Sequence, residues 1–322
     1  MTSTDLEFDD VIYQNEKILC FDASNILYRS FYANKNIEEE HIDGLVHRQF
    51  LTTLNKYYKQ LKPTKVVLTF DRPNWRKAYT KSEICVSKKI YKGNRRQDMT
   101  QKQQRMFELF MNCMGEFENL MRDHTSIITL SRDMLEADDL MAGIAEKYGN
   151  TPNELIIVTA DDDMLQLLKH DNISIVNPIA GKTSTLKDWD YDWRWFLFVK
   201  MFRGDRGDNV EKALPRIRVT KLKEAYTDDY KRNELLQQTW SRLDDNDQEI
   251  TFRVGDLYKE NEMLMDLTKQ PEYVKNIIND TINNGFANPG KFSMFHFLKF
   301  CGKHDLNKLA DKVQDFVPML SN

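Results

Sequence analysis

The segment "IIVTADDDMLQLL" at residues 156–168 determines how the rest of the chain is interpreted. A run of apolar, largely β-branched residues stops at three consecutive aspartates, and an amphipathic pattern follows. The run predicts a buried strand, with the aspartates at the start of the next helical segment. Helix capping alone explains one such cluster, because an Asp in this position stabilises a helix by about 0.3–1 kcal/mol. A functional site is indicated only if other strands end in the same way.

Apolar segments of the same kind recur before residue 190. Helical patterns such as residues 44–61 and 136–148 separate them. Strands that are apolar throughout and alternate with helices predict an α/β fold, with a mostly parallel central sheet covered by helices on both faces. The segments with strand character are residues 17–21, 66–70, 126–130, 155–159 and 173–176.

The second part of the chain has a different pattern. A chain of 322 residues is long enough for one large domain and a smaller one. The strand pattern ends near residue 190, and helical patterns with few glycines follow. We therefore predict an α/β core over residues 1–200 and an all-α C-terminal domain over residues 201–322. The polar segment 228–250 is expected to contain a loop.

Acidic residues follow four of the predicted strands, and two more lie in a glycine-rich loop near residue 205. The carboxyl ends of parallel strands open onto one crevice, so we expect these side chains to converge there. Helix capping accounts for any single cluster but does not predict clusters at nearly every strand end. The nine carboxylates are Asp22, Asp71, Glu136, Asp138, Asp139, Asp161, Asp163, Asp205 and Asp208.

Converging carboxylates repel one another unless cations lie between them. Oxygen ligands without a His or Cys partner select Mg²⁺ or Mn²⁺ rather than zinc or copper. Two such ions about 3.5–4 Å apart are the usual device for in-line displacement at a phosphodiester. The pattern therefore predicts a site for divalent metal ions.

A block of positive charge lies at residues 72–105, although the formal net charge of the chain is −4. The block holds eleven Lys and Arg residues against only Glu83 and Asp98. The alternative interpretation is a solvated helix face, but such faces usually mix both signs. A basic block within an otherwise acidic chain favours a polyanionic partner.

Other classes of protein are disfavoured by what the sequence lacks. It contains no P-loop motif and no G-x-G-x-x-G after a strand, and none of its six His residues forms a metal-spaced pair. Its four cysteines include no C-x-x-C pair, which suits reduced thiols in a cytoplasmic compartment. We also expect no membrane span and no secretory signal, because apolar runs are short and the first ten residues are acidic. A monomer in the cytoplasm is expected, in the host cytoplasm if the chain is phage-encoded.

These motifs together resemble the 5′-nuclease family, which includes flap endonucleases, the 5′-nuclease domains of bacterial DNA polymerases, and the phage ribonuclease H and 5′-3′ exonuclease branch. The resemblance covers about residues 17–225, and the motifs occur in the family's order and spacing. They read "CFDASNILYRSFYA", "LTFDRPNWRKAY", "LEADDLMAGIAEKY", "IVTADDDMLQLL" and "GDRGDNV".

The resemblance implies a PIN-like core with two Mg²⁺ ions, for which Mn²⁺ can substitute. Asp162 corresponds to a variable position between two ligands. The implied members of the first metal position, or its neighbours, are Asp22, Asp71, Glu136, Asp138 and Asp161. The implied members of the second are Asp139, Asp163, Asp205 and Asp208, some of them acting through water.

The basic block corresponds in this family to a helical arch, here residues 72–105, through which a single-stranded 5′ end passes. "IYKGNRRQ" matches a basic motif at the base of the arch. Lys92 and Arg95 would hold the scissile phosphate, with help from Arg96, and such electrostatic stabilisation is often the largest catalytic term. Tyr91 and Tyr28 would stack on unpaired bases, with core packing as the alternative. The nucleic-acid-binding residues implied here are Tyr28, Lys88, Lys89, Tyr91, Lys92, Arg95 and Arg96.

One segment departs from the family pattern. The family carries a Pro-Gly-Ile-Gly turn in a helix–hairpin–helix, whereas "ALPRIRVTKLKEAY" has Arg216 and Arg218 in place of the glycines. A turn without glycine is not expected to adopt positive φ or to hold the monovalent ion bound by relatives. Arg216, Arg218, Lys221 and Lys223 are instead expected to contact the duplex backbone through their side chains. The alternative is a helix with surface arginines.

The function implied is that of a Mg²⁺-dependent, structure-specific 5′ nuclease of the phage type, a 5′-3′ exonuclease or flap endonuclease with ribonuclease H activity. Its expected task is the removal of RNA primers from lagging-strand fragments, on flapped DNA or RNA–DNA hybrids with a 5′ end. A single-strand-binding protein or a sliding clamp is a plausible partner from the family. The alternatives are a catalytically inactive protein that binds DNA junctions and a PIN-type ribonuclease. The expected catalytic residues are Lys92, Arg95, Asp22, Asp71 and Asp161.

Overall fold

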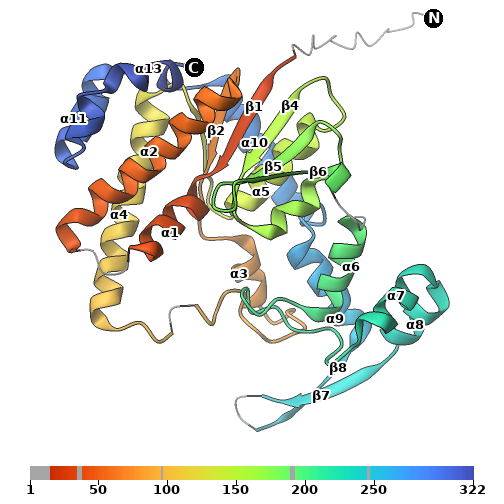
Figure 1. The fold of residues 1–322 in the computed structure, drawn as a ribbon. Coiled ribbons are helices and arrows are strands. Elements are labelled where there is room, and N and C mark those ends of the chain that lie inside the picture. The colour runs from red at the N-terminus through yellow and green to blue at the C-terminus, as the bar shows by residue number, and fades with distance from the viewer. Residues whose placement is uncertain (1–14, 35–37, 96, 189–192, 245–246) are drawn as a thin grey trace, which may run out of the picture.

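The computed structural model describes residues 15–34, 38–95, 97–188, 193–244 and 247–322, and its centre is a six-stranded sheet (Figure 1). The strand order is β3-β2-β1-β4-β5-β6, in which β6 is antiparallel to β5 and the other neighbouring pairs are parallel. The predicted α/β fold with a mostly parallel sheet is confirmed. The strands are β1 (Lys17–Asp22), β2 (Lys65–Thr69), β3 (Ile128–Leu130), β4 (Glu154–Val158), β5 (Ile173–Asn177) and β6 (Lys182–Thr185).

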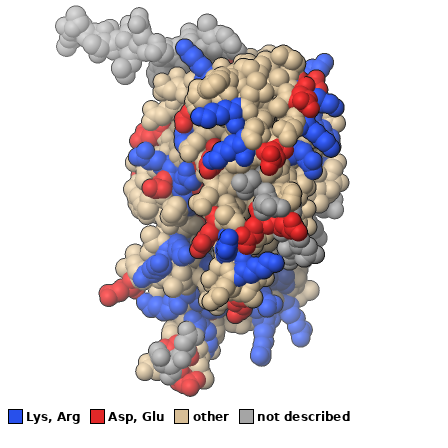
Figure 2. Space-filling view, turned by 90° about the vertical axis from the view of Figure 1, so that its left-hand side faces the viewer, with Lys and Arg blue, Asp and Glu red and all other residues tan. Residues whose placement is uncertain are grey.

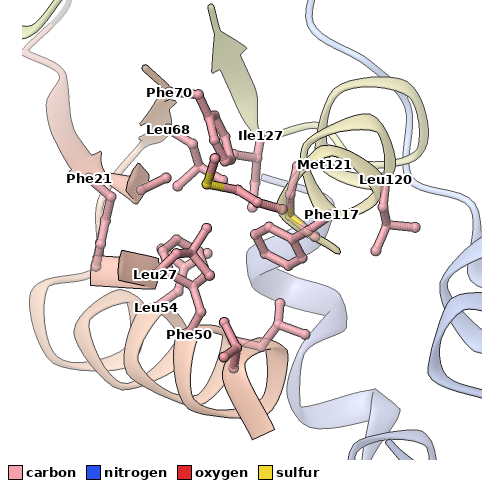
Figure 3. Close-up of a cluster of buried hydrophobic side chains, with 14 of the residues drawn as sticks. Phe21, Leu27, Phe50, Leu54, Leu68, Phe70, Phe117, Leu120, Met121 and Ile127 are labelled. Atoms are coloured by element: carbon pink, nitrogen blue, oxygen red, sulfur yellow. The ribbon is translucent and has the colours of Figure 1, made fainter. Parts of the chain in front are cut away.

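Both faces of the sheet are buried, which explains why the strands are apolar throughout. Successive residues of a strand face opposite sides, and in β1 Leu19 and Phe21 belong to one core cluster while Ile18 and Cys20 belong to another. Figure 3 shows the first cluster, where helices bring large side chains against Phe21. Helices on this face are α1 (Ala23–Ala33), α2 (Ile42–Leu61) and α4 (Gln101–His124), and those on the other are α5 (Ala137–Tyr148) and α10 (Glu272–Ala287).

The last helices of the chain pack on the α/β core. Phe297 and Leu320 are fully buried in the same cluster as Phe21, and the Ser126 amide donates to the Leu320 carbonyl at 2.8 Å. The division of the chain near residue 200 stays a prediction, but residues 272–320 contact the core directly. The helices that follow α10 are α11 (Met294–Lys303), α12 (Asn307–Ala310) and α13 (Val317–Leu320).

A third apolar cluster lies beside the sheet and includes a hairpin where the sequence led us to expect a loop. On the hairpin, Trp240 and Phe252 face inward with ring centroids 5.1 Å apart, whereas Ser241 and Thr251 face outward and hydrogen-bond at 2.9 Å. With so few apolar residues on one face, the alternation is too short to predict a strand. The elements here are α6 (Trp193–Arg203), α7 (Val219–Thr227), α8 (Asp229–Leu236), β7 (Thr239–Leu243), β8 (Glu249–Arg253) and α9 (Val254–Met265).

The basic block is less helical than expected. It contains α3 (Trp75–Thr80) and the first turn of α4, and the described residues between 81 and 100 form turns and irregular chain. Within the described ranges, no helix combines the length and apolarity needed to cross a membrane. Short 3₁₀ segments are η1 (Glu39–His41), η2 (Asp162–Leu167), η3 (Leu186–Asp188) and η4 (Val313–Asp315).

Candidate active site

Four carboxylates from separate elements come together at the carboxyl ends of the strands. Asp22 ends β1, Asp71 follows β2, Asp161 follows β4, and Asp138 lies in the first turn of α5. β1 lies between β2 and β4, so the ends of these strands are adjacent. Burial raises the pKa of Asp22 to about 7, and repulsion from Asp71 and Asp161 adds to the effect. The predicted convergence is therefore real for these four side chains.

Two other members of this acidic cluster, Asp138 and Asp71, are also affected by burial and by repulsion. Burial raises the pKa of Asp138 well above its usual value, with further contributions from Asp22 and Asp161. Burial also raises the pKa of Asp71, and Glu136 adds to it. Asp71 and Asp138 keep some solvent contact, yet the surrounding protein still disfavours their charged forms. The cluster is a concentration of negative charge that a cation would stabilise.

Hydrogen bonds hold these carboxylates in place before any ligand binds. The Asp22 carboxylate accepts from the Asn25 amide at 2.9 Å and from the Thr159 hydroxyl at 3.0 Å. Asp71 accepts from the Ala137 amide at 2.9 Å, which ties the end of β2 to the start of α5. The site is thus built on rigid strand ends and a helix start.

A second acidic cluster forms around Lys200 of α6. The Lys200 ammonium pairs with Asp163 and, at 3.1 Å, with Asp205. Burial raises the pKa of Asp163 despite the ion pair. Burial acts in the same direction on Asp205, but Lys200 and two backbone amides outweigh it and hold the pKa of Asp205 below its usual value. Lys200 therefore occupies the position between two predicted metal ligands.

Asp208 connects the glycine-rich loop to the basic block. Its carboxylate accepts from the Tyr91 hydroxyl at 2.6 Å and from the Arg95 guanidinium at 2.6 Å. Its carbonyl accepts from the Lys92 amide at 2.7 Å. The Lys92 ammonium lies 2.6 Å from Glu136 and 3.8 Å from Asp208, so it spans both acidic groups. Burial opposes the charge on Lys92, but Glu136 and Asp208 outweigh it and raise its pKa.

Asp139 does not join the predicted second group. It is fully buried, and its two oxygens accept from the Arg76 guanidinium at 2.7 and 2.9 Å. The Gln270 amide donates to it at 3.2 Å. Successive residues on a helix point about 100° apart, so Asp138 faces the crevice while Asp139 faces the interior. We therefore correct the expectation that Asp139 is a metal ligand.

The two tyrosines pack against other side chains, as their alternative interpretation proposed: Tyr91 is buried and Tyr28 is half-buried. Tyr91 is 5% exposed, and its hydroxyl is taken by Asp208. Tyr28 packs against Phe107 and Phe110 with ring centroids 6.2 and 5.2 Å away. The burial of Tyr91 and the contacts of Tyr28 with two phenylalanine rings favour core packing over the expected stacking role.

The remaining basic residues differ in how they are held. Lys88 is exposed and donates to the Glu83 carbonyl at 2.8 Å. Lys89 pairs with Glu211 at 2.7 Å. Arg96, which we expected to assist Lys92 and Arg95, lies outside the described residues.

A buried glutamate far along the chain holds the basic loop, and sequence reasoning missed it. Glu260 of α9 is 4% exposed and accepts from the backbone amides of Val86 and, at 2.9 Å, Ser87. It also accepts from the Tyr79 hydroxyl at 3.1 Å. These bonds fasten the chain that leads into Lys92 to α9. No local sequence signal connects Glu260 to a loop so distant in sequence.

The carboxylate oxygens of the first acidic cluster are the ligands that a hard divalent cation prefers. The side chains, however, are not arranged around a common point as metal ligands would be. Among the described residues, no group of three or more His, Cys, Asp or Glu is placed so that it could hold a metal ion as it stands. The four carboxylates of this cluster repel one another, and within the same ranges no Lys or Arg forms an ion pair with any of them. They are Asp22, Asp71, Asp138 and Asp161.

The segment predicted to bind a duplex keeps the backbone shape that we expected it to lose. Arg216 has φ +60°, the left-handed conformation that glycine favours, so the expectation of no positive φ was wrong. Arg216, Arg218, Lys221 and Lys223 are all exposed around the start of α7. Their predicted contact with a duplex stays a prediction, and their exposure is compatible with it.

We expect Arg216→Gly to raise the free energy of unfolding by about 0.5–1 kcal/mol. A left-handed conformation costs a non-glycine residue about 1–2 kcal/mol, and the added freedom of glycine in the unfolded chain offsets part of that gain. Urea unfolding measures the change. Arg218→Gly is the matched control, because Arg218 has φ −79° and should only lose stability. Equal destabilisation by both substitutions would contradict a strained turn.

Figure 2 views the side of the molecule that carries α1, α2 and α4, and Lys and Arg side chains lie around groups of acidic ones on it. This side of the surface therefore carries both positive and negative charges.

Comparison with known proteins places these observations in context. A family model for the N-terminal resolvase-like domain of 5′-3′ exonucleases matches residues 17–194. The 5′-3′ exonuclease of Buchnera aphidicola subsp. Schizaphis graminum is 29% identical over 214 residues, 63% of this chain and 67% of that protein. The ribonuclease H of Enterobacteria phage T4 is 24% identical over 320 residues, 94% of this chain and 96% of that protein.

The fold is also similar to solved structures. The bacteriophage T5 flap endonuclease, in a complex with DNA and metal ions, matches with a TM-score of 0.62 at 17% identity, over 84% of this chain and 100% of that one. A T5 5′-exonuclease with bound zinc matches equally, with a TM-score of 0.62 and 17% identity, over 84% of this chain and 99% of that one. At this identity the likeness concerns the fold alone.

Proposed function

Because this chain belongs to the 5′-3′ exonuclease family, and is therefore a nuclease, we propose that it is a Mg²⁺-dependent, structure-specific 5′ nuclease acting on flapped or branched DNA and on RNA–DNA hybrids. The observation that carries this proposal is the group of four mutually repulsive carboxylates at the carboxyl ends of the strands. It lies beside the two cations expected to hold a phosphate, Lys92 and Arg95.

The proposed metal ligands are a revised set. Mg²⁺ suits them because all donors are oxygens, and Mn²⁺ can substitute. When bound, two such ions lower the pKa of the attacking water and stabilise the leaving oxygen. The residues that would hold the first ion or adjoin it are Asp22, Asp71, Glu136, Asp138 and Asp161, and those for the second are Asp163, Asp205 and Asp208.

The chain's own basic residues bind and orient the phosphate. Lys92 and Arg95 hold their positions through Asp208, and Tyr91 holds Asp208 in turn. A substrate phosphate would replace carboxylate oxygens as the hydrogen-bond acceptor for these cations. The cations would then stabilise the negative charge of the phosphate from positions that they already hold before the reaction. Lys200 would likewise be displaced from Asp163 when a cation arrives.

The substrate and the biological task follow from the surface and from the relatives. The duplex would contact Arg216, Arg218, Lys221 and Lys223 without regard to sequence, and such binding weakens with salt. The names ribonuclease H and 5′-3′ exonuclease of the relatives support RNA primers on lagging-strand fragments as the physiological target. A sliding clamp or single-strand-binding protein would then be the partner, and a monomer in the cytoplasm the acting form.

Cleavage of a 5′-labelled flap in Mg²⁺ tests the proposal, with Asp161→Asn against Asp162→Asn. We expect Asp161→Asn to lower the rate by at least about a hundredfold, a loss typical of a group that stabilises charge in the transition state. Asp162 is exposed and makes no contact with the cluster that the described residues record, so Asp162→Asn should keep most activity. EDTA should abolish cleavage and added Mg²⁺ restore it. Tight flap binding without cleavage in any divalent ion would instead favour a non-catalytic junction-binding protein.

A further inference from the structure

A second basic segment precedes the block at residues 72–105. Residues 44–70 contain no Asp or Glu but hold five Lys and Arg residues. Four of these cations lie on α2 or at its C-cap and are exposed, and we call them the α2 basic face. They are Arg48, Lys56, Lys59 and Lys62.

The placement of these charges follows from the amphipathic pattern of α2. Phe50 and Leu54 point into the first core cluster, so positions on the opposite side of the helix face solvent. Arg48, Lys56 and Lys59 share that outer side with polar residues. At 1.5 Å per residue, the α2 basic face extends for about 20 Å from Arg48 to Lys62.

The α2 basic face differs in its contacts from the part of the block between Lys89 and Arg95. There Lys89, Lys92 and Arg95 each have a carboxylate partner. On α2, the structure pairs none of the four cations with a carboxylate of the described ranges. Like charges kept unpaired in a row destabilise a fold slightly, so a role toward an external anion is indicated.

The position of α2 suggests which anion this is. In Figure 1, α7 and α2 lie on opposite sides of the end of β1, where the chain passes into α1. If the duplex part of a substrate rests on the start of α7, as proposed above, its 5′ strand would run past this strand end toward α1, α2 and α4. Arg105 of α4 pairs with Glu39 at 3.0 Å, which places the end of the basic block beside the start of α2.

We propose that the α2 basic face binds the backbone of the single-stranded 5′ portion of the substrate after it has passed the active site. The proposal rests on the proposed function and adds to it a surface that retains long flaps. A single row of long, flexible cations suits one extended strand, which it contacts through phosphates without reading sequence.

The test compares the full chain with a fourfold Gln variant of the α2 basic face on substrates with a long flap, a short flap and no flap. For the long flap, we expect KM to rise about tenfold at low salt. We also expect the slope of log KM against log salt to fall by about 0.7 for each phosphate that the variant no longer neutralises. For the substrate without a flap, KM and kcat should be unchanged. Thermal unfolding confirms that the variant is folded.

A matched control removes four exposed lysines from other surfaces. Gln at Lys182, Lys187, Lys269 and Lys291 changes the net charge equally and should leave the dependence on flap length as it is. An equal effect of both variants, or an effect on all three substrates alike, would overturn the proposal. Loss of binding to anionic lipid vesicles with unchanged flap cleavage would overturn it as well.

Failure of the proposed function is distinguishable from failure of this surface. If the wild-type chain cleaves none of the substrates, the proposed function fails. Fluorescence anisotropy with a labelled single-stranded oligonucleotide still measures the α2 basic face in that case. Equal affinity of wild type and fourfold variant would then reject the surface independently.

Discussion

Asp138→Asn is expected to lower the rate of flap cleavage by about a thousandfold and at the same time to make the protein more stable. Asp138 lies among Asp22, Asp161 and Glu136, which together with burial raise its pKa. Burial and these neighbours therefore destabilise the charged form of Asp138 in the folded protein, and the uncharged Asn removes that cost. The same charge is needed to attract the proposed cation, so activity and stability change in opposite directions.

Steady-state cleavage and thermal unfolding measure the two effects. The control is Asp133→Asn, the same substitution at an exposed position shortly before α5. It should leave both quantities nearly unchanged. A variant of Asp138 that keeps activity, or that loses stability, would show that the carboxylate has a structural role instead.

Arg76→Met is expected to reduce the free energy of unfolding by about 3–5 kcal/mol, the usual cost of removing one partner of a buried ion pair. Arg76 is 1% exposed and donates to Asp139, to Glu136 at 3.1 Å and to the Leu264 carbonyl at 2.8 Å. The substitution leaves the Asp139 carboxylate buried without its cation. It also releases α9 from α3.

Urea unfolding measures the loss, with Lys77→Met as the control because Lys77 is the exposed neighbour of Arg76. A double variant, Arg76→Met with Asp139→Leu, should recover part of the stability, since replacing both partners by apolar groups avoids an unpaired charge. No recovery in the double variant would mean that the Leu264 contact, rather than the ion pair, dominates.

The fold was predictable because its decisive signals are local. Each strand of a sheet that is buried on both faces is apolar throughout. The residues that follow neighbouring parallel strands all lie at the same edge of the sheet. This is why Asp22, Asp71 and Asp161 were identified correctly as converging. The split of the carboxylates between two metal positions stays a prediction, and the structure holds Asp163 and Asp205 together on Lys200.

The expectations that the structure does not support have a different origin, because they concern contacts between distant parts of the chain. Asp138 and Asp139 are chemically identical neighbours, and only the position of Arg76 separates their roles. Tyr91 is buried in the second core cluster and donates its hydroxyl to Asp208, and Glu260 holds a basic loop more than a hundred residues away. Local patterns carry no information about such partners.

The way in which α11 to α13 complete the first core cluster has a consequence for folding kinetics. Phe297 and Leu320 fill space against Phe21, so the cluster needs residues from far apart in the chain. A high average sequence separation between contacts slows folding, because the entropy of closing long loops is lost before the contacts form. The sheet and the carboxylates at its strand ends are therefore expected to reach their final rigidity only late, after the last helices have docked.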